Sequence, residues 1–120
     1  TFYGVRDVLG RLRDDDTTAV VPMQAWDADT LVAEAYPAAT FGWLGCYREG
    51  YKNVDDPRKR REANVAAVEA CSVTVGEHRD TYLGNHDALD SLAAVVSAGR
   101  LADGVRPSAA GPESEGCIYV

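Results

Sequence analysis

Three acidic residues have the types and spacing that metal-dependent chemistry needs. Glu34 lies near the end of an apolar run over residues 29–36, where an ionised carboxylate is costly to bury unless a cation or hydrogen bonds offset it. Asp87 and Asp90 share a face of a predicted helix, and His86 lies on the same side, four residues before Asp90. Magnesium and manganese ions prefer carboxylate oxygens, and two such ions can activate water and stabilise a leaving oxygen in phosphodiester cleavage. Glu34, Asp87 and Asp90 are therefore candidate ligands of Mg or Mn.

Each of these acids also has an interpretation without chemistry. Glu34 could be a strand-end glutamate that reaches solvent or an arginine, and acids such as Asp87 and Asp90 are favoured in a first helical turn by capping and the helix dipole. The small residues Ala94 and Ser97 continue the helix face, which would let the helix approach a sheet closely enough for its acids to meet Glu34. Spacing alone leaves both interpretations open.

The basic residues suggest a local contact with an anion. One consecutive run is present, Arg58-Lys59-Arg60-Arg61. It opens a predicted helix, where the dipole disfavours positive charge, so a phosphate backbone is one explanation. The alternative is a solvated face paired with Asp55, Asp56 and Glu62. Lys52 could reach an anionic substrate or balance an acid.

Composition limits the classes of protein. A chain of 120 residues with 46% hydrophobic and 26% charged residues is typical of one globular domain. Twelve basic against nineteen acidic residues give a net charge of -7, so any nucleic-acid contact must be local. Three cysteines without CxxC spacing indicate neither a disulfide framework nor a zinc site and fit a reducing cytoplasm. No apolar run approaches the roughly 20 residues that cross a bilayer, so we expect no membrane segment.

The first half of the chain predicts a helix, two strands and a short helix. Apolar residues recur at helical spacing over residues 3–13, and β-branched or apolar runs predict strands at 18–23 and 29–36. We expect the second strand to be the more buried one. Pro37 suits the first turn of a short helix that ends near Gly45.

The second half predicts two longer helices and a closing strand. Asp56 followed by Pro57 marks the start of a helix that reaches about Cys71, while residues 72–84 fit either a strand or a connection. Asn85 can cap a further helix, and residues 117–120 read as a last strand. The core stripe expected for the capped helix is Leu89, Leu92, Ala93 and Val96.

Four short motifs follow one another along the chain. They are Glu34-Ala35-Tyr36-Pro37-Ala38, Gly50-Tyr51-Lys52, His86-Asp87-Ala88-Leu89-Asp90-Ser91-Leu92 and Glu115-Gly116 before the closing strand. Their order resembles the domain-of-unknown-function family 429 over residues 31–120. The resemblance implies a predicted nuclease with an RNase H-like, three-layer α/β fold. The Asp-x-x-Asp helix also looks like the final helix of Holliday-junction resolvases.

The resemblance also implies roles for individual residues. Glu34 corresponds to the acid that ends the fourth strand, and Asp87 or Asp90 to the acid on the last helix. Lys52 and Arg58 or Arg61 fall at the family's basic positions, so the predicted substrate-binding set is Lys52, Arg58, Arg61 and His86. The first strand of that fold, with its central aspartate, would lie upstream, so residues 1–120 are expected to be the C-terminal portion of one RNase H-like domain.

Two functions follow as expectations. The first is a metal-dependent nuclease that cleaves phosphodiester bonds at a two-metal carboxylate site and contacts nucleic acid through local basic residues. The second is a non-catalytic structural or protein-interaction module, for which a homodimer could cover a sheet edge. A small-molecule phosphate enzyme would need a glycine-rich phosphate loop, and the sequence contains none.

Overall fold

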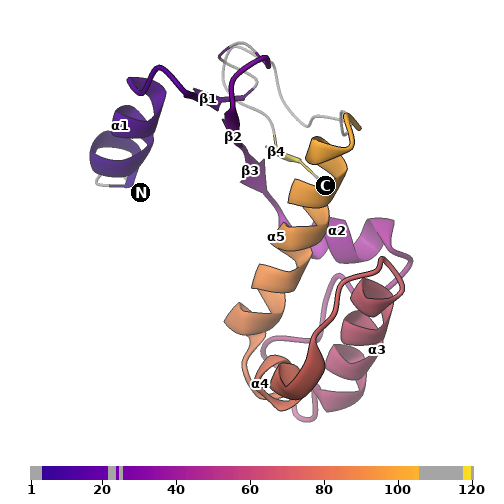
Figure 1. Ribbon diagram of the computed structural model, residues 1–120. Helices are drawn as coiled ribbons and strands as arrows, with labels where there is room; N and C mark the ends of the chain where they lie inside the picture. The colour runs from indigo at the N-terminus through magenta and orange to yellow at the C-terminus, as the bar shows by residue number, and fades with distance from the viewer. Residues whose placement is uncertain (1–3, 22–23, 25, 106–117, 120) are drawn as a thin grey trace. The chain divides into compact units, whose positions relative to one another are not determined.

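A computed structural model describes residues 4–21, 24, 26–105 and 118–119, and the chain divides into two compact units. The first unit comprises residues 1–34 and 108–119, and the second comprises residues 35–107 with residue 120. The architecture is mixed α/β, with a small parallel sheet in the first unit and several helices in the second (Figure 1). Whether the two units form one domain stays a prediction.

The first unit contains one helical segment and a two-stranded parallel sheet. A π-helical turn, η1 (Gly4–Leu9), runs into α1 (Gly10–Arg13), which confirms the predicted helix. Strand β1 (Thr18–Val20) pairs in parallel with β2 (Thr30–Val32). Both predicted strands are therefore present within the described residues.

The expected burial of the second strand is wrong. Ala19 and Val20 of β1 are buried, since α1 packs beside that strand, whereas no residue of β2 is fully buried. Among the described residues β2 belongs to a sheet of only two strands, so one of its edges has no strand beside it. The run is also interrupted at Ala33, and the next strand, β3 (Glu34–Ala35), places Glu34 in solvent.

Strand β3 pairs with the predicted closing strand. That strand, β4 (Ile118–Tyr119), forms a second two-stranded sheet with β3. The prediction of a strand at the end of the sequence is therefore confirmed. The remaining residues of the predicted segment, Cys117 and Val120, lie outside the described residues.

The second unit is helical. Its elements are α2 (Pro37–Trp43), α3 (Arg58–Glu69), the 3-10 turn η2 (Gly76–His78), α4 (Arg79–Gly84) and α5 (His86–Ala102). The three predicted helices are confirmed, and the ambiguous segment 72–84 proves to be mainly helical. Helix α5 packs against α2, α3 and α4 (Figure 1). Among the helices described, none has the length and apolar character needed to cross a bilayer.

The core of the second unit forms along α5 as predicted. Leu89, Leu92, Ala93 and Val96 are all buried and pack with apolar residues of α2, α3 and α4. Phe41 of α2 meets the ring of Tyr51 edge-on, with the ring centroids 5.2 Å apart. This aromatic contact fixes the segment that follows α2 against the core.

The expected line of small residues on α5 does not face a sheet within this unit. Ala94 is exposed, and the buried Ser97 lies with its hydroxyl 3.0 Å from that of Thr40 on α2. Small side chains at Thr40 and Ser97 bring the two helices together and satisfy each other's polar groups. Within this unit Ser97 therefore packs on a helix instead of the expected sheet.

Candidate functional site

The acidic residues of α5 are positioned by the cap at the start of that helix. The side chain of Asn85 accepts hydrogen bonds from the backbone N–H of Asp87 at 2.8 Å and of Ala88 at 3.2 Å. This cap confirms the predicted start of α5 and sets His86, Asp87 and Asp90 on its first turns. One potential ligand atom from each of these three residues lies within 4.8 Å of the other two.

His86 and Asp87 form the outer part of this cluster. Nδ1 of His86 lies 3.1 Å from Oδ1 of Asp87, whose side chain is 83% exposed. Although the distance is that of an ion pair, the atoms are not aligned for a hydrogen bond, and Nδ1 is buried without a hydrogen-bond partner among the described residues. This nitrogen is therefore available as a ligand atom beside the Asp87 carboxylate.

Asp90 forms the inner part, and both of its carboxylate oxygens are engaged. Oδ1 accepts a 2.9 Å hydrogen bond from the hydroxyl of Tyr51, and Oδ2 lies 2.5 Å from Nζ of Lys52. The Asp90 side chain is only 17% exposed. Burial of Tyr51, followed by its hydrogen bond to Asp90, raises the pKa of the Tyr51 phenol well above its ordinary value. Tyr51 therefore donates to Asp90 at every physiological pH.

The backbone of Tyr51 and Lys52 is held by Arg61 of α3. This arginine is 7% exposed, and its guanidinium donates to the carbonyls of Tyr51 at 2.6 Å, Leu83 at 3.0 Å and Lys52 at 3.2 Å. Asn64 lies one turn further along α3, and its amide exchanges two hydrogen bonds with the backbone of Tyr47. One face of α3 thus anchors the segment 47–52, which we call the anchored loop.

A glycine in the anchored loop makes room for a second arginine. Gly50 has a φ of +71°, and a Cβ added there would overlap Nη1 of Arg60. Arg60 also donates to the carbonyl of Glu49 at 3.3 Å, and its guanidinium lies 5.5 Å from the centre of the Tyr47 ring. Both the backbone angle and the close packing therefore require glycine at position 50.

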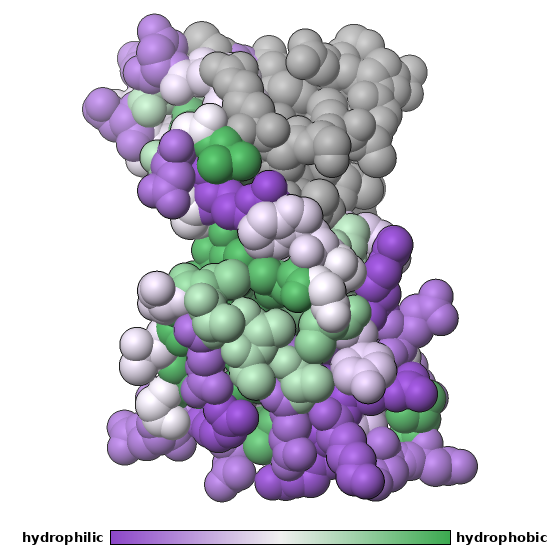
Figure 2. Space-filling model, turned by 90° about the vertical axis from the view of Figure 1, so that its right-hand side faces the viewer, coloured by the Kyte–Doolittle hydropathy of each residue, from purple (hydrophilic) through white to green (hydrophobic). Residues whose placement is uncertain are grey.

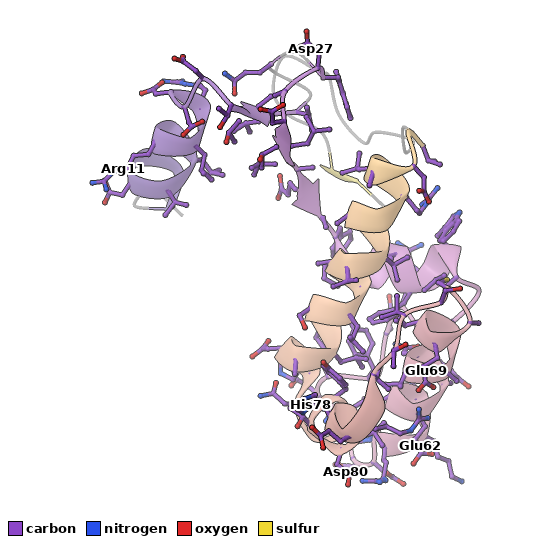
Figure 3. All side chains as sticks on the ribbon, viewed as in Figure 1. Arg11, Asp27, Glu62, Glu69, His78 and Asp80 are labelled. Carbon is purple, nitrogen blue, oxygen red and sulfur yellow. The ribbon has the colours of Figure 1, made fainter. Side chains whose placement is uncertain are left out.

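The basic run at the start of α3 does not act as one patch. Arg61 points into the core and Arg60 packs on the anchored loop, whereas Arg58 pairs with Glu62 at 3.2 Å and with Asp80 at 3.9 Å. Figure 3 labels both acidic partners, and Figure 2 shows hydrophilic side chains over this lower part of the second unit. Of the acids expected to balance the run, Glu62 pairs with it. The substrate-binding roles of Arg58 and Arg61 stay predictions.

The second unit also has an open pocket of about 380 Å³. It is lined by Tyr36, Ala38 and residues 48–54, which include the two residues that bind Asp90, Tyr51 and Lys52. The stem of Arg48 crosses the surface of α2 at Gly42, where an added Cβ would lie 2.5 Å from Cδ of Arg48. Tyr51 and Lys52 thus line the pocket and also bind Asp90 of the acidic cluster.

The second unit therefore brings together four of the residues predicted from sequence, namely Lys52, His86, Asp87 and Asp90. Arg61 lies behind them and supports Lys52 through its backbone, while Arg58 pairs with acids elsewhere on the surface. Glu34 belongs to the first unit, so its convergence on this cluster stays a prediction.

Two residues of this region were missed by sequence reasoning. Tyr51 was assigned no role, although its place directly before Lys52 in the motif Gly50-Tyr51-Lys52 was a usable signal. Arg48 gave no signal, because a single arginine among loop residues is ordinary surface.

These features define the class of protein: a mixed α/β chain with an acidic cluster at the start of α5. The family described as Protein of unknown function (DUF429) matches residues 7–115, and the chain belongs to this family. The match begins upstream of residue 31, where the motif resemblance started. No curated protein matches the chain, and no solved structure matches it. The RNase H-like fold stays a prediction.

Proposed function

We propose that this protein is a metal-dependent nuclease in which Asp87 and Asp90 bind a divalent cation beside the phosphodiester to be hydrolysed, and the role of Glu34 as a further ligand stays a prediction. The observation that carries the proposal is the cluster at the start of α5, where His86, Asp87 and Asp90 offer ligand atoms within 4.8 Å of one another. Membership in a family of unknown function neither names a reaction nor conflicts with this one.

The donor set fits a divalent cation. Two carboxylates supply the hard oxygen atoms that Mg and Mn prefer, and the buried Nδ1 of His86 has no hydrogen-bond partner among the described residues. Imidazole nitrogen is a better ligand for transition metals than for magnesium, so of these two ions manganese suits the mixed set better. Such a cation, when bound, would supply an activated water and stabilise the leaving oxygen.

The surrounding residues orient the carboxylates and balance charge. Tyr51 holds Oδ1 of Asp90 from the core side, which fixes the direction of that carboxylate. Lys52 places a positive charge beside Asp90 at the edge of the pocket, where an anionic phosphate would approach. Arg61 acts as a positioning residue, since it holds the carbonyls of Tyr51 and Lys52.

A second candidate function is that of a non-catalytic structural or interaction module. The observation that favours it is that both oxygens of Asp90 already have protein partners, Tyr51 and Lys52. In that case Asp90 attaches the anchored loop to α5, and Asp87 stabilises the N-terminus of α5 by its interaction with the helix dipole.

Calorimetric titration with Mn²⁺ distinguishes the two functions. We expect Asp87→Asn to weaken Mn²⁺ binding at least tenfold with little effect on stability, because its side chain is exposed. Asp80→Asn is the matched control, since Asp80 is an exposed acid on α4. If wild-type protein binds no Mn²⁺, or if the Asp87 and Asp80 variants bind it equally well, the metal site is refuted.

Cleavage is measured separately on single-stranded, double-stranded and branched DNA and RNA with Mn²⁺. We expect cutting that is lost in Asp87→Asn and retained in Asp80→Asn. A protein that binds Mn²⁺ and cuts none of these substrates would exclude nuclease activity and leave a metal-binding module.

A further inference from the structure

Arg48 lines the pocket and has no partner among the residues that the structure describes. The chain carries nineteen acidic against twelve basic residues, yet Arg48 makes no hydrogen bond or ion pair with any residue that the structure describes. By contrast, Arg58, Arg60 and Arg61 all have partners. An unpaired guanidinium lining a pocket is available to an anionic ligand.

The position of Arg48 depends on a glycine of α2, Gly42. Gly42 lets the stem of Arg48 lie against the helix, with Cγ and Cδ 2.7 and 2.5 Å from the place where a Cβ would be. Even alanine at position 42 would therefore displace the stem. The guanidinium is thus carried on a supported stem, which lowers the entropy lost when it binds a ligand.

The charge around the pocket favours one anion of modest size. Arg48 and Lys52 contribute two positive charges and Glu49 one negative charge, while Lys52 is already paired with Asp90. The volume of about 380 Å³ is at the small end of ligand sites, and the half-exposed ring of Tyr36 forms part of the wall. A phosphate offers the oxygen pairs that a guanidinium binds with both arms, and an aromatic wall suits a nucleobase.

We infer that this pocket holds one nucleotide of a single strand, with its phosphate on Arg48 and its base against Tyr36. The identity of the ligand as nucleic acid rests on the proposed nuclease function. The nucleotide in the pocket would be a neighbour of the nucleotide whose phosphodiester lies at Asp90. Tyr51 and Lys52 line the pocket and also contact Asp90.

The test is the binding of a fluorescently labelled oligothymidylate in EDTA at low salt, followed by anisotropy. We expect Arg48→Met to weaken binding at least fivefold. Arg79→Met is the matched control, because it removes the same charge from α4, where Arg79 pairs with Glu69. Equal affinities for these two variants would overturn the inference.

Gly42→Ala tests the position of Arg48 at constant charge. We expect Gly42→Ala to weaken oligonucleotide binding as much as Arg48→Met does. Its unfolding midpoint should stay close to that of the control Arg79→Met. A folded Gly42→Ala protein that binds as the wild type would overturn the role of the supported stem.

Competition identifies the ligand class. Thymidine monophosphate and inorganic phosphate should displace the labelled strand from wild-type protein, whereas succinate at equal ionic strength should not. Displacement by succinate alone would assign the pocket to carboxylates and overturn the inference. Because EDTA removes divalent cations, this binding assay does not depend on the metal site, whereas the Mn²⁺ titration does not depend on Arg48, so a failed metal site and a failed pocket give different results.

Discussion

The phenolic hydroxyl of Tyr51 donates a 2.9 Å hydrogen bond to Oδ1 of Asp90, which lies 39 residues further along the chain. The donor belongs to the anchored loop and the acceptor to the second turn of α5. The Tyr51 ring is 1% exposed and packs edge-on against Phe41, so the position of Asp90 depends on the hydrophobic core. Core packing of the Tyr51 ring thereby fixes the position of Asp90, a candidate metal ligand.

Replacement of Tyr51 by phenylalanine should destabilise the fold by about 1–2 kcal/mol, because a hydrogen bond to an ionised carboxylate is lost while the packing is kept. Urea unfolding at neutral pH measures this change. Tyr47→Phe is the matched control, because the exposed Tyr47 ring can keep its contact with Arg60.

The same variant should respond differently to alkali. Because burial and Asp90 raise the pKa of Tyr51 in the folded protein, the unfolded chain loses this proton first as pH rises past its ordinary value of 10.0. The unfolded state then binds fewer protons, so the stability contributed by Tyr51 is complete below pH of about 10 and falls above it. Wild type and Tyr47→Phe should lose stability more steeply above this pH than Tyr51→Phe. Equal slopes would contradict the assignment.

Arg61→Lys should destabilise the fold by about 2–3 kcal/mol, since an ammonium cannot span the three carbonyls that the guanidinium joins. Arg58→Lys, at an exposed position on the same helix, should stay within about 0.5 kcal/mol of wild type. Thermal unfolding of both variants makes the comparison. Similar stabilities for the two would show that Arg61 does not support the anchored loop.

Gly50→Ala should destabilise the fold by about 1–2 kcal/mol from its left-handed backbone alone, and it should also displace Arg60. Gly99→Ala is the opposite control. Gly99 lies inside α5 with open space around it, so alanine there should stabilise by about 0.5–1 kcal/mol. Chemical unfolding measures the stability of both variants. A change of the same sign in Gly50→Ala and Gly99→Ala would contradict the role given to Gly50.

Lys52 should couple the metal site to the pocket. A cation bound at Asp90 would take over the neutralisation that Lys52 now provides, and the ammonium could then turn to a phosphate. Saturating Mn²⁺ should therefore tighten the binding of an uncleavable oligonucleotide by at least about fivefold, and the oligonucleotide should tighten Mn²⁺ binding by the same factor. Lys52→Met should reduce this factor. A factor unchanged in Lys52→Met would mean that the coupling runs through direct contact between metal and phosphate.

The parts of the fold that depend on neighbours in sequence were predictable. The stripe from Leu89 to Val96 and the cap at Asn85 follow from helical periodicity and turn chemistry, and both are present. The grouping of Asp87 with Asp90 follows from the same periodicity, because residues three apart share a helix face. Local spacing thus determined most of the acidic cluster.

The remaining features depend on contacts between distant segments. Arg58 and Arg61 have the same side chain on the same helix, but one faces solvent and the other the core, according to what packs against α3. Glu34 was expected in a buried strand, yet burial depends on which elements cover a strand, and apolar neighbours in sequence do not reveal them. The Tyr51–Asp90 contact likewise joins residues too far apart for any spacing rule.

The paired hydrogen bonds between Asn64 and the backbone of Tyr47 also determine where the chain can accept inserted residues. A helix side chain here supplies both bonds that an adjacent strand would otherwise supply, so residues 47–52 have a fixed register against α3. The exposed residues 53–56 carry no such anchor among the described contacts. Insertions should therefore be accommodated between Asn53 and Asp56, whereas one extra residue between Tyr47 and Lys52 would move Lys52 away from Asp90.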